Sequence, residues 1–180
     1  MAVERPDNPR VLIPEERLRA RVKELAREIE DSYEGLEPVV AICVLKGSFV
    51  FFSDLIRQID HPITCEFLGL QGYSSRPSQS GEVKITLDLA NSIAGKHVLI
   101  IEDVIDSGAT LQFLLQTLVA RKPASLKVCS LFVKSHTIRA PYEIDYVGFH
   151  IGDEFVVGYG IDHAERYRWL SYIGVVERPL

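Results

Sequence analysis

The sequence has few cysteines, and their number and spacing argue against a disulfide framework. Only Cys43, Cys65 and Cys129 occur among 180 residues; their number is odd and no CxxC pair is present. Each lies within a short apolar run, so we expect buried, reduced thiols. This cysteine usage favours a cytoplasmic protein over a secreted one.

Long apolar stretches are also absent. No segment reaches the ~18 consecutive apolar residues that a membrane-spanning helix requires. The first residues, MAVERPDNPR, lack the apolar stretch of a signal peptide. The sequence shows no internal repeat and no low-complexity tract, so we expect a single domain over residues 1–180 without a membrane partner.

The chain carries less positive charge than proteins that bind nucleic acid usually do. The chain carries 20 Lys and Arg against 25 Asp and Glu, a net charge of -5. Proteins that wrap duplex nucleic acid usually present a basic face, so we expect no nucleic-acid partner. A few local donors can nevertheless bind a small anionic ligand. The P-loop pattern GxxxxGK[ST], the dinucleotide pattern GxGxxG and a HxxxH metal pair are all missing.

Apolar periodicity predicts alternating strands and helices. In VLIPEERLRARVKELAREIEDSY, Leu18, Val22, Leu25 and Ile29 share one face of a helix. The wholly apolar runs PVVAICVL, HVLIIEDV and SLKVCSLFVK are typical of strands buried on both faces. Helical segments SFVFFSDLIRQI and TLQFLLQTLVARK follow two of these strands. The alternation predicts an α/β fold with a mostly parallel, twisted sheet flanked by helices, its core over about residues 36–140.

The last part of the chain changes character. DYVGFHI, EFVVGYG and YIGVV predict short strands separated by polar turns. We expect them to form a small hood, from about residues 1–14 and 141–180, over the edge of the sheet. Earlier, QGYSSRPSQSGEV predicts a long functional loop or lid, and KITLDL predicts the returning arm of a hairpin.

The segment VLIIEDVIDSGATL carries the strongest chemical signal. Glu102 and Asp103 end a buried strand, Asp106 lies in the loop, and Ser107, Gly108 and Thr110 lead into a helix. Free backbone N–H groups at a helix N-terminus bind phosphate, and ligands of open α/β sheets bind at the carboxyl ends of strands. Two adjacent carboxylates would repel that phosphate, but they suit ribose hydroxyls or Mg²⁺. The alternative is a strand end followed by a solvated acidic turn.

Other polar residues have an ordinary structural interpretation when taken alone. Lys46 and Gly47 form a strand-to-helix turn, and Lys134 is a strand-end lysine that can face solvent. Phe155 within FVV is typical of a core residue. Three further residues suit a solvated loop: Asp162, His163 and Arg168.

These residues together carry a family resemblance. VLIIEDVIDSGATL resembles the donor-binding signature of the type I phosphoribosyltransferases. The segments ICVLKGSFVFFSDL, SGEVKI, LFVKS and DEFVVGYGIDHAERYRWLSYIGVV resemble the hypoxanthine-guanine branch of that family. The likeness extends from about Val11 to Val176, and the final third distinguishes the purine branch.

The resemblance implies a donor site. Ribose and 5-phosphate binding falls on Glu102, Asp103, Asp106, Ser107, Gly108, Ala109 and Thr110. Pyrophosphate binding falls on Leu45, Lys46, Gly47 and Arg168, often with a cis peptide in that loop. Mg²⁺ is the implied cofactor, with Glu102, Asp103 and Asp162 as its ligands.

The resemblance also implies a purine site. Lys134 donates to the 6-oxo group, Phe155 stacks on the ring, and Val156 and Asp162 hold its edge, while Asp106 is the general base toward N7. The implied lid carries Gly72 and Tyr73, where the family usually has a Ser-Tyr pair.

The implied activity is transfer of the 5-phosphoribosyl group from 5-phosphoribosyl 1-diphosphate to N9 of hypoxanthine or guanine. The products would be IMP or GMP and pyrophosphate, and the implied assembly is a homodimer or homotetramer. A regulatory or nucleic-acid-binding protein of the same fold is one alternative. The same chemistry on xanthine or uracil is another.

Overall fold

The computed structural model describes residues 9–72, 83–135 and 142–176. A six-stranded sheet in the order β4-β3-β2-β5-β6-β7 forms its centre. Five strands run parallel: β2 (Val39–Leu45), β3 (Ile63–Gly72), β5 (His97–Ile105), β6 (Ser125–Lys134) and β7 (Tyr146–Ile151). The sixth, β4 (Val83–Leu87), pairs antiparallel with β3 as the predicted returning arm of a hairpin.

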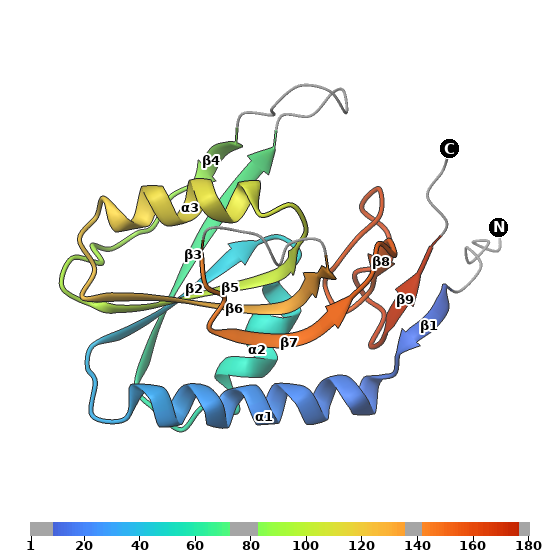
Figure 1. The fold of residues 1–180 in the computed structure, drawn as a ribbon, viewed down its shortest axis with the longest axis horizontal. Helices are drawn as coiled ribbons and strands as arrows, with labels where there is room; N and C mark the ends of the chain where they lie inside the picture. Colours follow the sequence, from blue (N-terminus) through green and yellow to red (C-terminus); the bar gives the residue numbers. More distant parts are fainter. Residues whose placement is uncertain (1–8, 73–82, 136–141, 177–180) are drawn as a thin grey trace, which may run out of the picture.

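Helices cover both faces of this sheet (Figure 1). The first layer comprises α1 (Glu15–Tyr33) and α2 (Phe49–Ile56), and the opposite layer is α3 (Ala109–Val119). The four α1 residues predicted to share one face are buried, together with inward residues of β2 and β5 such as Ala41 and Leu99. Alternate residues of the same strands, including Ile42 and Ile100, pack with α3. This two-sided burial confirms the predicted α/β class.

The chain leaves the two central strands in opposite directions. From β2 it passes through α2 to β3, whereas from β5 it passes through α3 to β6. The connections therefore diverge between β2 and β5, and the carboxyl ends of these neighbours stay uncovered. Ligands of open α/β sheets bind at such a point of divergence.

Three short strands form a second sheet beyond this edge. In the order β1-β9-β8, it joins Arg10–Ile13, Ile173–Val175 and Val156–Val157 in antiparallel pairs. Figure 1 shows it beside the ends of β5 and β6. Both ends of the chain thus contribute to one layer, as expected for the hood.

Two expectations need correction. The tail strand Tyr146–Ile151 was assigned to the hood, but it extends the main sheet as β7. Arg21 of α1 fixes it there by donating to the carbonyls of Val147 and Gly148. Cys43 and Cys129 are buried, but Cys65 is exposed because β3 is covered mainly on the face of Glu66 and Leu68.

In the part of the chain that the structure describes, no helix combines the length and apolar character needed to cross a membrane. Gly72 ends β3, whereas Tyr73 and most of the expected lid lie outside the described residues. The assignment of residues 1–180 to one domain stays a prediction.

The packing of α3 fixes the loop that precedes it, and this gives a test of the fold. Leu114 is fully buried against the sheet, so Leu114→Ala should lower the free energy of unfolding by about 2–5 kcal/mol. Gln116→Ala, an exposed change in the same helix, should stay within about 0.5 kcal/mol. Urea unfolding of both variants measures the difference, and equal losses would contradict the assigned burial.

Candidate active site

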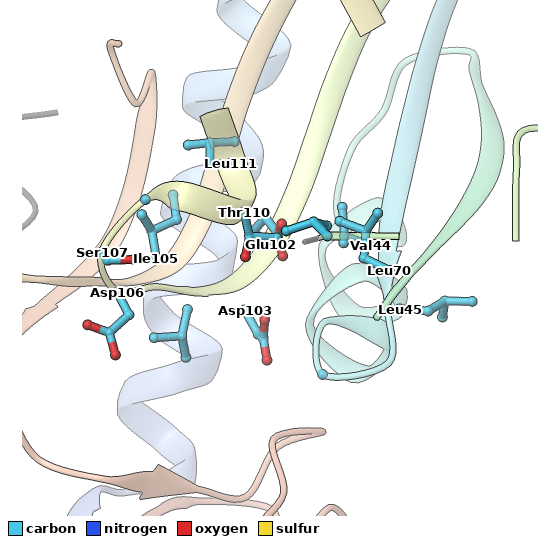
Figure 2. A pocket seen from close by; sticks show the side chains of 14 residues that line it. Val44, Leu45, Leu70, Glu102, Asp103, Ile105, Asp106, Ser107, Thr110 and Leu111 are labelled. Carbon is cyan, nitrogen blue, oxygen red and sulfur yellow. The ribbon is translucent and has the colours of Figure 1, made fainter. Parts of the chain in front are cut away.

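A cavity of about 270 Å³ opens at the carboxyl ends of β2 and β5. On one side it is lined by the end of β5 and the loop after it, from Glu102 to Gly108, and by Thr110. The apolar side chains of Val44, Leu45 and Leu70 lie opposite (Figure 2). The segment with the strongest chemical signal therefore forms a wall of a cavity at the predicted edge of the sheet.

The loop enters α3 through a residue with left-handed backbone geometry. Gly108 has φ of 79°, a conformation that side chains other than glycine adopt with strain. The amides that open α3 lack partners within the helix, and the helix dipole is positive at this end. Since Ser107, Gly108 and Thr110 line the cavity, the arrangement suits a bound phosphate.

The two strand-end acids are held in an unfavourable environment. Glu102 is buried, and this burial, with the charge of Asp103 beside it, raises the pKa of its carboxyl well above the usual range. Burial also raises the pKa of Asp103, although backbone N–H groups and Arg168 favour its charged form. Such carboxylates gain stability from a hydroxyl donor or a cation placed in the cavity.

The turn after β2 comes close to these acids. A Cβ atom on Gly47 would lie 1.7 Å from Oδ2 of Asp103, so the contact requires glycine. The Leu45–Lys46 peptide bond is cis, as the family resemblance implies for this loop. Leu45 and Gly47 thus face the acids across the first cavity.

A second cavity, of about 310 Å³, adjoins the first. Asp103, Val104 and Asp106 line both. The remaining lining consists of Lys134, Glu154, Phe155, Val156, Ile161 and Asp162. The predicted purine-binding residues therefore meet around one space, and that space shares a wall with the predicted phosphate site.

An ion pair joins Lys134 of the second cavity to Asp106 of the shared wall. Nζ of Lys134 lies 2.9 Å from Oδ2 of Asp106. The lysine side chain is only 6% exposed, whereas that of Asp106 is 52% exposed. The alternative of a solvent-facing Lys134 is therefore wrong, and its ammonium group faces the second cavity. Burial of a lysine at this depth requires such a partner.

The tail supplies a further charged group. Arg168 donates to the Gly160 carbonyl at 2.9 Å and contacts Asp162 at 2.8 Å and Glu165 at 3.1 Å. Glu165 also contacts Nζ of Lys46 at 3.2 Å, which links the turn after β2 to the tail. His163 packs its ring edge-on against Phe155, with centroids 5.2 Å apart. Arg168 itself lines neither cavity, and its partner Asp162 lines the second.

Comparison with known proteins agrees with this arrangement. A family model described as phosphoribosyl transferase domain matches residues 14–164. The hypoxanthine-guanine phosphoribosyltransferase of Mycobacterium avium is 48% identical over 172 residues, which cover 93% of this chain and 85% of that protein. The chain belongs to the hypoxanthine-guanine phosphoribosyltransferase family. The Bacillus subtilis member is 46% identical, with 95% of this chain and 94% of that protein covered.

Solved structures of hypoxanthine-guanine phosphoribosyltransferases share the fold. A crystal structure from Bacillus anthracis, with a HEPES molecule in its active site, has a TM-score of 0.87 and 47% identity. The aligned region covers 93% of the present chain and 98% of the Bacillus anthracis chain. A ternary substrates complex of the Trypanosoma cruzi hypoxanthine phosphoribosyltransferase has a TM-score of 0.86 and 41% identity, covering 93% and 95%.

Some residues expected from the family fall outside the two cavities. Ala109 lines neither, and the amine of Lys46 turns toward Glu165. Within the described residues, no three Asp, Glu, His or Cys side chains form a group that could hold a metal by themselves. The set Glu102, Asp103 and Asp162 is therefore not a complete protein-only metal site.

Sequence reasoning missed two acids. Glu165 connects Lys46 with Arg168, and its position three residues before Arg168 was the available signal. Glu154 lines the second cavity although it precedes the expected stacking residue. Glu154 was overlooked because no local pattern distinguishes a cavity-lining acid from a solvated one.

The burial of Glu102 predicts a pH-dependent stability. With a raised pKa, folded Glu102 retains a proton that the unfolded chain releases above its ordinary value of 4.5. Folding therefore weakens as the pH rises from that value toward the folded pKa. Glu102→Gln does not titrate, so its margin of stability over the native chain should grow as the pH rises from 4.5 toward about 8. Below the unfolded pKa, the pH-dependent part of this margin should vanish.

Urea unfolding across this pH range measures the margin. Glu16→Gln, which removes the same charge from the exposed side of α1, is the control and should show no comparable pH-dependent gain. A margin for Glu102→Gln that stays constant with pH, or that reverses sign, would contradict the assignment.

Proposed function

We propose that this chain transfers the 5-phosphoribosyl group from 5-phosphoribosyl 1-diphosphate to N9 of hypoxanthine or guanine, releasing pyrophosphate. The shared wall of the two cavities carries the proposal. Asp103, Val104 and Asp106 line a space suited to phosphate and ribose as well as a space suited to a purine. Because the two spaces adjoin at these residues, a donor and a base bound there lie side by side, with C1 of the ribose close to N9 of the base.

The donor would occupy the first cavity. Backbone amides of residues 107–110 bind the 5-phosphate at the start of α3, supported by the Ser107 and Thr110 hydroxyls. Glu102 and Asp103 accept hydrogen bonds from the ribose hydroxyls, which offsets the cost of burying these acids. Leu45, Lys46 and Gly47 hold the pyrophosphate with their backbone, and Arg168 offers it a planar cation.

The base would occupy the second cavity. Phe155 supplies a ring for stacking, and the backbone at Val156 and Asp162 meets the ring edge. The buried ammonium of Lys134 donates to the 6-oxo group. It disfavours adenine, whose exocyclic amine is itself a donor. Asp106 lies beside Lys134, where it can hold the proton at N7.

Mg²⁺ fits this site as a partner of the donor. Magnesium commonly binds through one or two carboxylates together with substrate phosphates, so a complete cage of protein ligands is not needed. Asp103 and Asp162 border the second cavity, and Glu102 borders the first. When bound, the ion would neutralise charge on the departing pyrophosphate.

The residues also suit the expected course of the reaction. As the bond between C1 and the pyrophosphate oxygen breaks, positive charge develops on the ribose. The carboxylates of Asp103 and Asp106 lie on the wall beside it and stabilise this charge. N9 then forms the bond to C1 as pyrophosphate leaves, and the Asp106 carboxylate accepts the proton from N7, so that the purine of the product is neutral.

We also propose that the chain works in the cytoplasm as a homodimer or homotetramer. Phe49 of α2 is 44% exposed and Trp169 of the tail is 68% exposed, and both line one apolar hollow. Such side chains are common at contacts between subunits. Light scattering of the purified chain tests the assembly.

Turnover assays test the proposed activity. With the ribosyl diphosphate donor and Mg²⁺, nucleotide should form from hypoxanthine and guanine, and not from adenine or uracil. Asp106→Asn should lower kcat by about 10²–10⁴-fold, the usual contribution of a general base. Asp88→Asn should leave kcat near the native value, because Asp88 pairs with Arg121 away from both cavities.

Each outcome of this assay has a clear consequence. Absence of turnover with every base would overturn the enzyme function and favour a regulatory protein of the same fold. Turnover of uracil alone would retain the fold and refute the roles of Lys134 and Phe155. Turnover of xanthine in place of hypoxanthine and guanine would refute the assigned base.

A second variant tests the role of Arg168. Arg168→Lys keeps the charge but loses the planar group that contacts Gly160 and Asp162 together. The KM for the diphosphate donor should rise on the order of tenfold, with a smaller change in the KM for the purine. Arg166→Lys, an exposed neighbour, is the control. An unchanged donor KM in Arg168→Lys would exclude the pyrophosphate role.

A further inference from the structure

Tyr159 lines neither of the two cavities, yet its side chain connects the tail of the chain to α2. The residue is 6% exposed, and its hydroxyl donates a hydrogen bond of 2.7 Å to Oδ2 of Asp54 in α2. A hydrogen bond to a carboxylate is stronger than one between neutral groups. Burial and the Asp54 carboxylate raise the pKa of the Tyr159 hydroxyl, so it remains a donor over the ordinary pH range.

The backbone of Tyr159 adopts a conformation that depends on such contacts. Its φ of 51° lies in the left-handed region, which residues other than glycine rarely adopt. Its amide donates to the Leu170 carbonyl at 2.8 Å. Because a backbone of this kind persists only where the surrounding structure fixes it, the hydroxyl and the amide together hold the turn around Tyr159 in place.

The next residue, Gly160, lies directly against the donor half of the site. A Cβ atom on Gly160 would lie 2.4 Å from the Gly47 carbonyl oxygen, so the two turns are in close contact. The Gly160 carbonyl accepts the hydrogen bond from the Arg168 guanidinium, and its amide donates to the Arg168 carbonyl at 3.0 Å. Gly160 thus contacts both groups to which the proposed function assigns the pyrophosphate.

The purine half of the site is held by other contacts. Val156 pairs with β9 as part of the second sheet, and Lys134 pairs with Asp106. Of the residues assigned to the base, only Asp162 follows closely after Tyr159. A displaced Tyr159 turn should therefore affect the donor more than the purine.

We infer that Tyr159 is a positioning residue of the donor site. Its hydrogen bond to Asp54 anchors the turn that places Gly160 against the Gly47 turn and against the Arg168 guanidinium. This inference rests on the proposed function, which assigns pyrophosphate to those two groups. A binding group has to be held within about 0.5 Å of its productive position, so the residues that support it contribute to affinity.

The test removes the hydroxyl alone. Tyr159→Phe should raise the KM for the ribosyl diphosphate donor on the order of tenfold, because the turn loses its hydrogen bond to a charged group. The KM for hypoxanthine should change much less. A merely structural role would reduce the amount of folded enzyme, which lowers the apparent kcat and leaves both KM values unchanged.

Asp54 supplies an independent check. Asp54→Ala removes the acceptor, so it should raise the donor KM by a similar factor, and adding Tyr159→Phe to it should cause little further change. Asp54→Asn keeps an acceptor oxygen and should restore part of the donor affinity. If the two effects multiply in the double variant, the side chains act separately and the inference is wrong.

Tyr33→Phe is the matched control. It also removes a buried hydroxyl, in this case one that donates to the Val98 carbonyl near the start of β5. This variant should lose stability in urea unfolding and keep both native KM values. Native turnover with an unchanged donor KM in Tyr159→Phe would overturn this inference alone. Failure of the native chain to convert hypoxanthine and guanine would overturn the proposed function, and the inference with it.

Discussion

The parallel pairing of β2 with β5 is the constraint on which the rest of the site depends. Because the chain turns away from these strands in opposite directions, their carboxyl ends remain open side by side. The turn at Gly47 can then approach Asp103, and the loop after Asp103 can open into the first turn of α3. The first cavity lies at that divergence, and the second shares Asp103, Val104 and Asp106 with it.

The electrostatic arrangement favours ligand binding over stability. Glu102 and Asp103 are adjacent carboxyls whose pKa values are raised by burial, and the chain gives them few partners of its own. Lys134 is buried with a half-exposed carboxylate as its partner. Proteins commonly accept such local costs where a ligand completes the set of interactions.

Local sequence pattern predicted most of the fold. The wholly apolar run PVVAICVL became β2 of the parallel sheet, and the spacing from Leu18 to Ile29 became the buried face of α1. The assignment of β7 to the hood was wrong, because a strand of mixed burial at a sheet edge has the same local pattern as a strand of a small separate layer. Its place is set by parallel pairing with β6 and by hydrogen bonds from Arg21, which lies more than a hundred residues earlier in the sequence.

The site was predictable only in part. The motif around Glu102 and Asp106 indicated phosphate and ribose chemistry because its residues are neighbours in sequence. Taken alone, Lys134 and Arg168 were typical of solvated residues, and only the family resemblance assigned them to the site. The position of Glu154 at the second cavity and the ion pair of Glu165 with Lys46 depend on neighbours brought from other segments by the tertiary fold, which no local spacing encodes.

The wall shared by the two cavities has a thermodynamic consequence. A ligand that changes the position or protonation of Asp103 or Asp106 in one cavity also changes the lining of the other. The affinities of the two compartments are then linked, and linkage is reciprocal: each ligand alters the affinity of the other by the same factor. One molecule long enough to enter both compartments would pay the entropic cost of association once, so its affinity can far exceed that of either half.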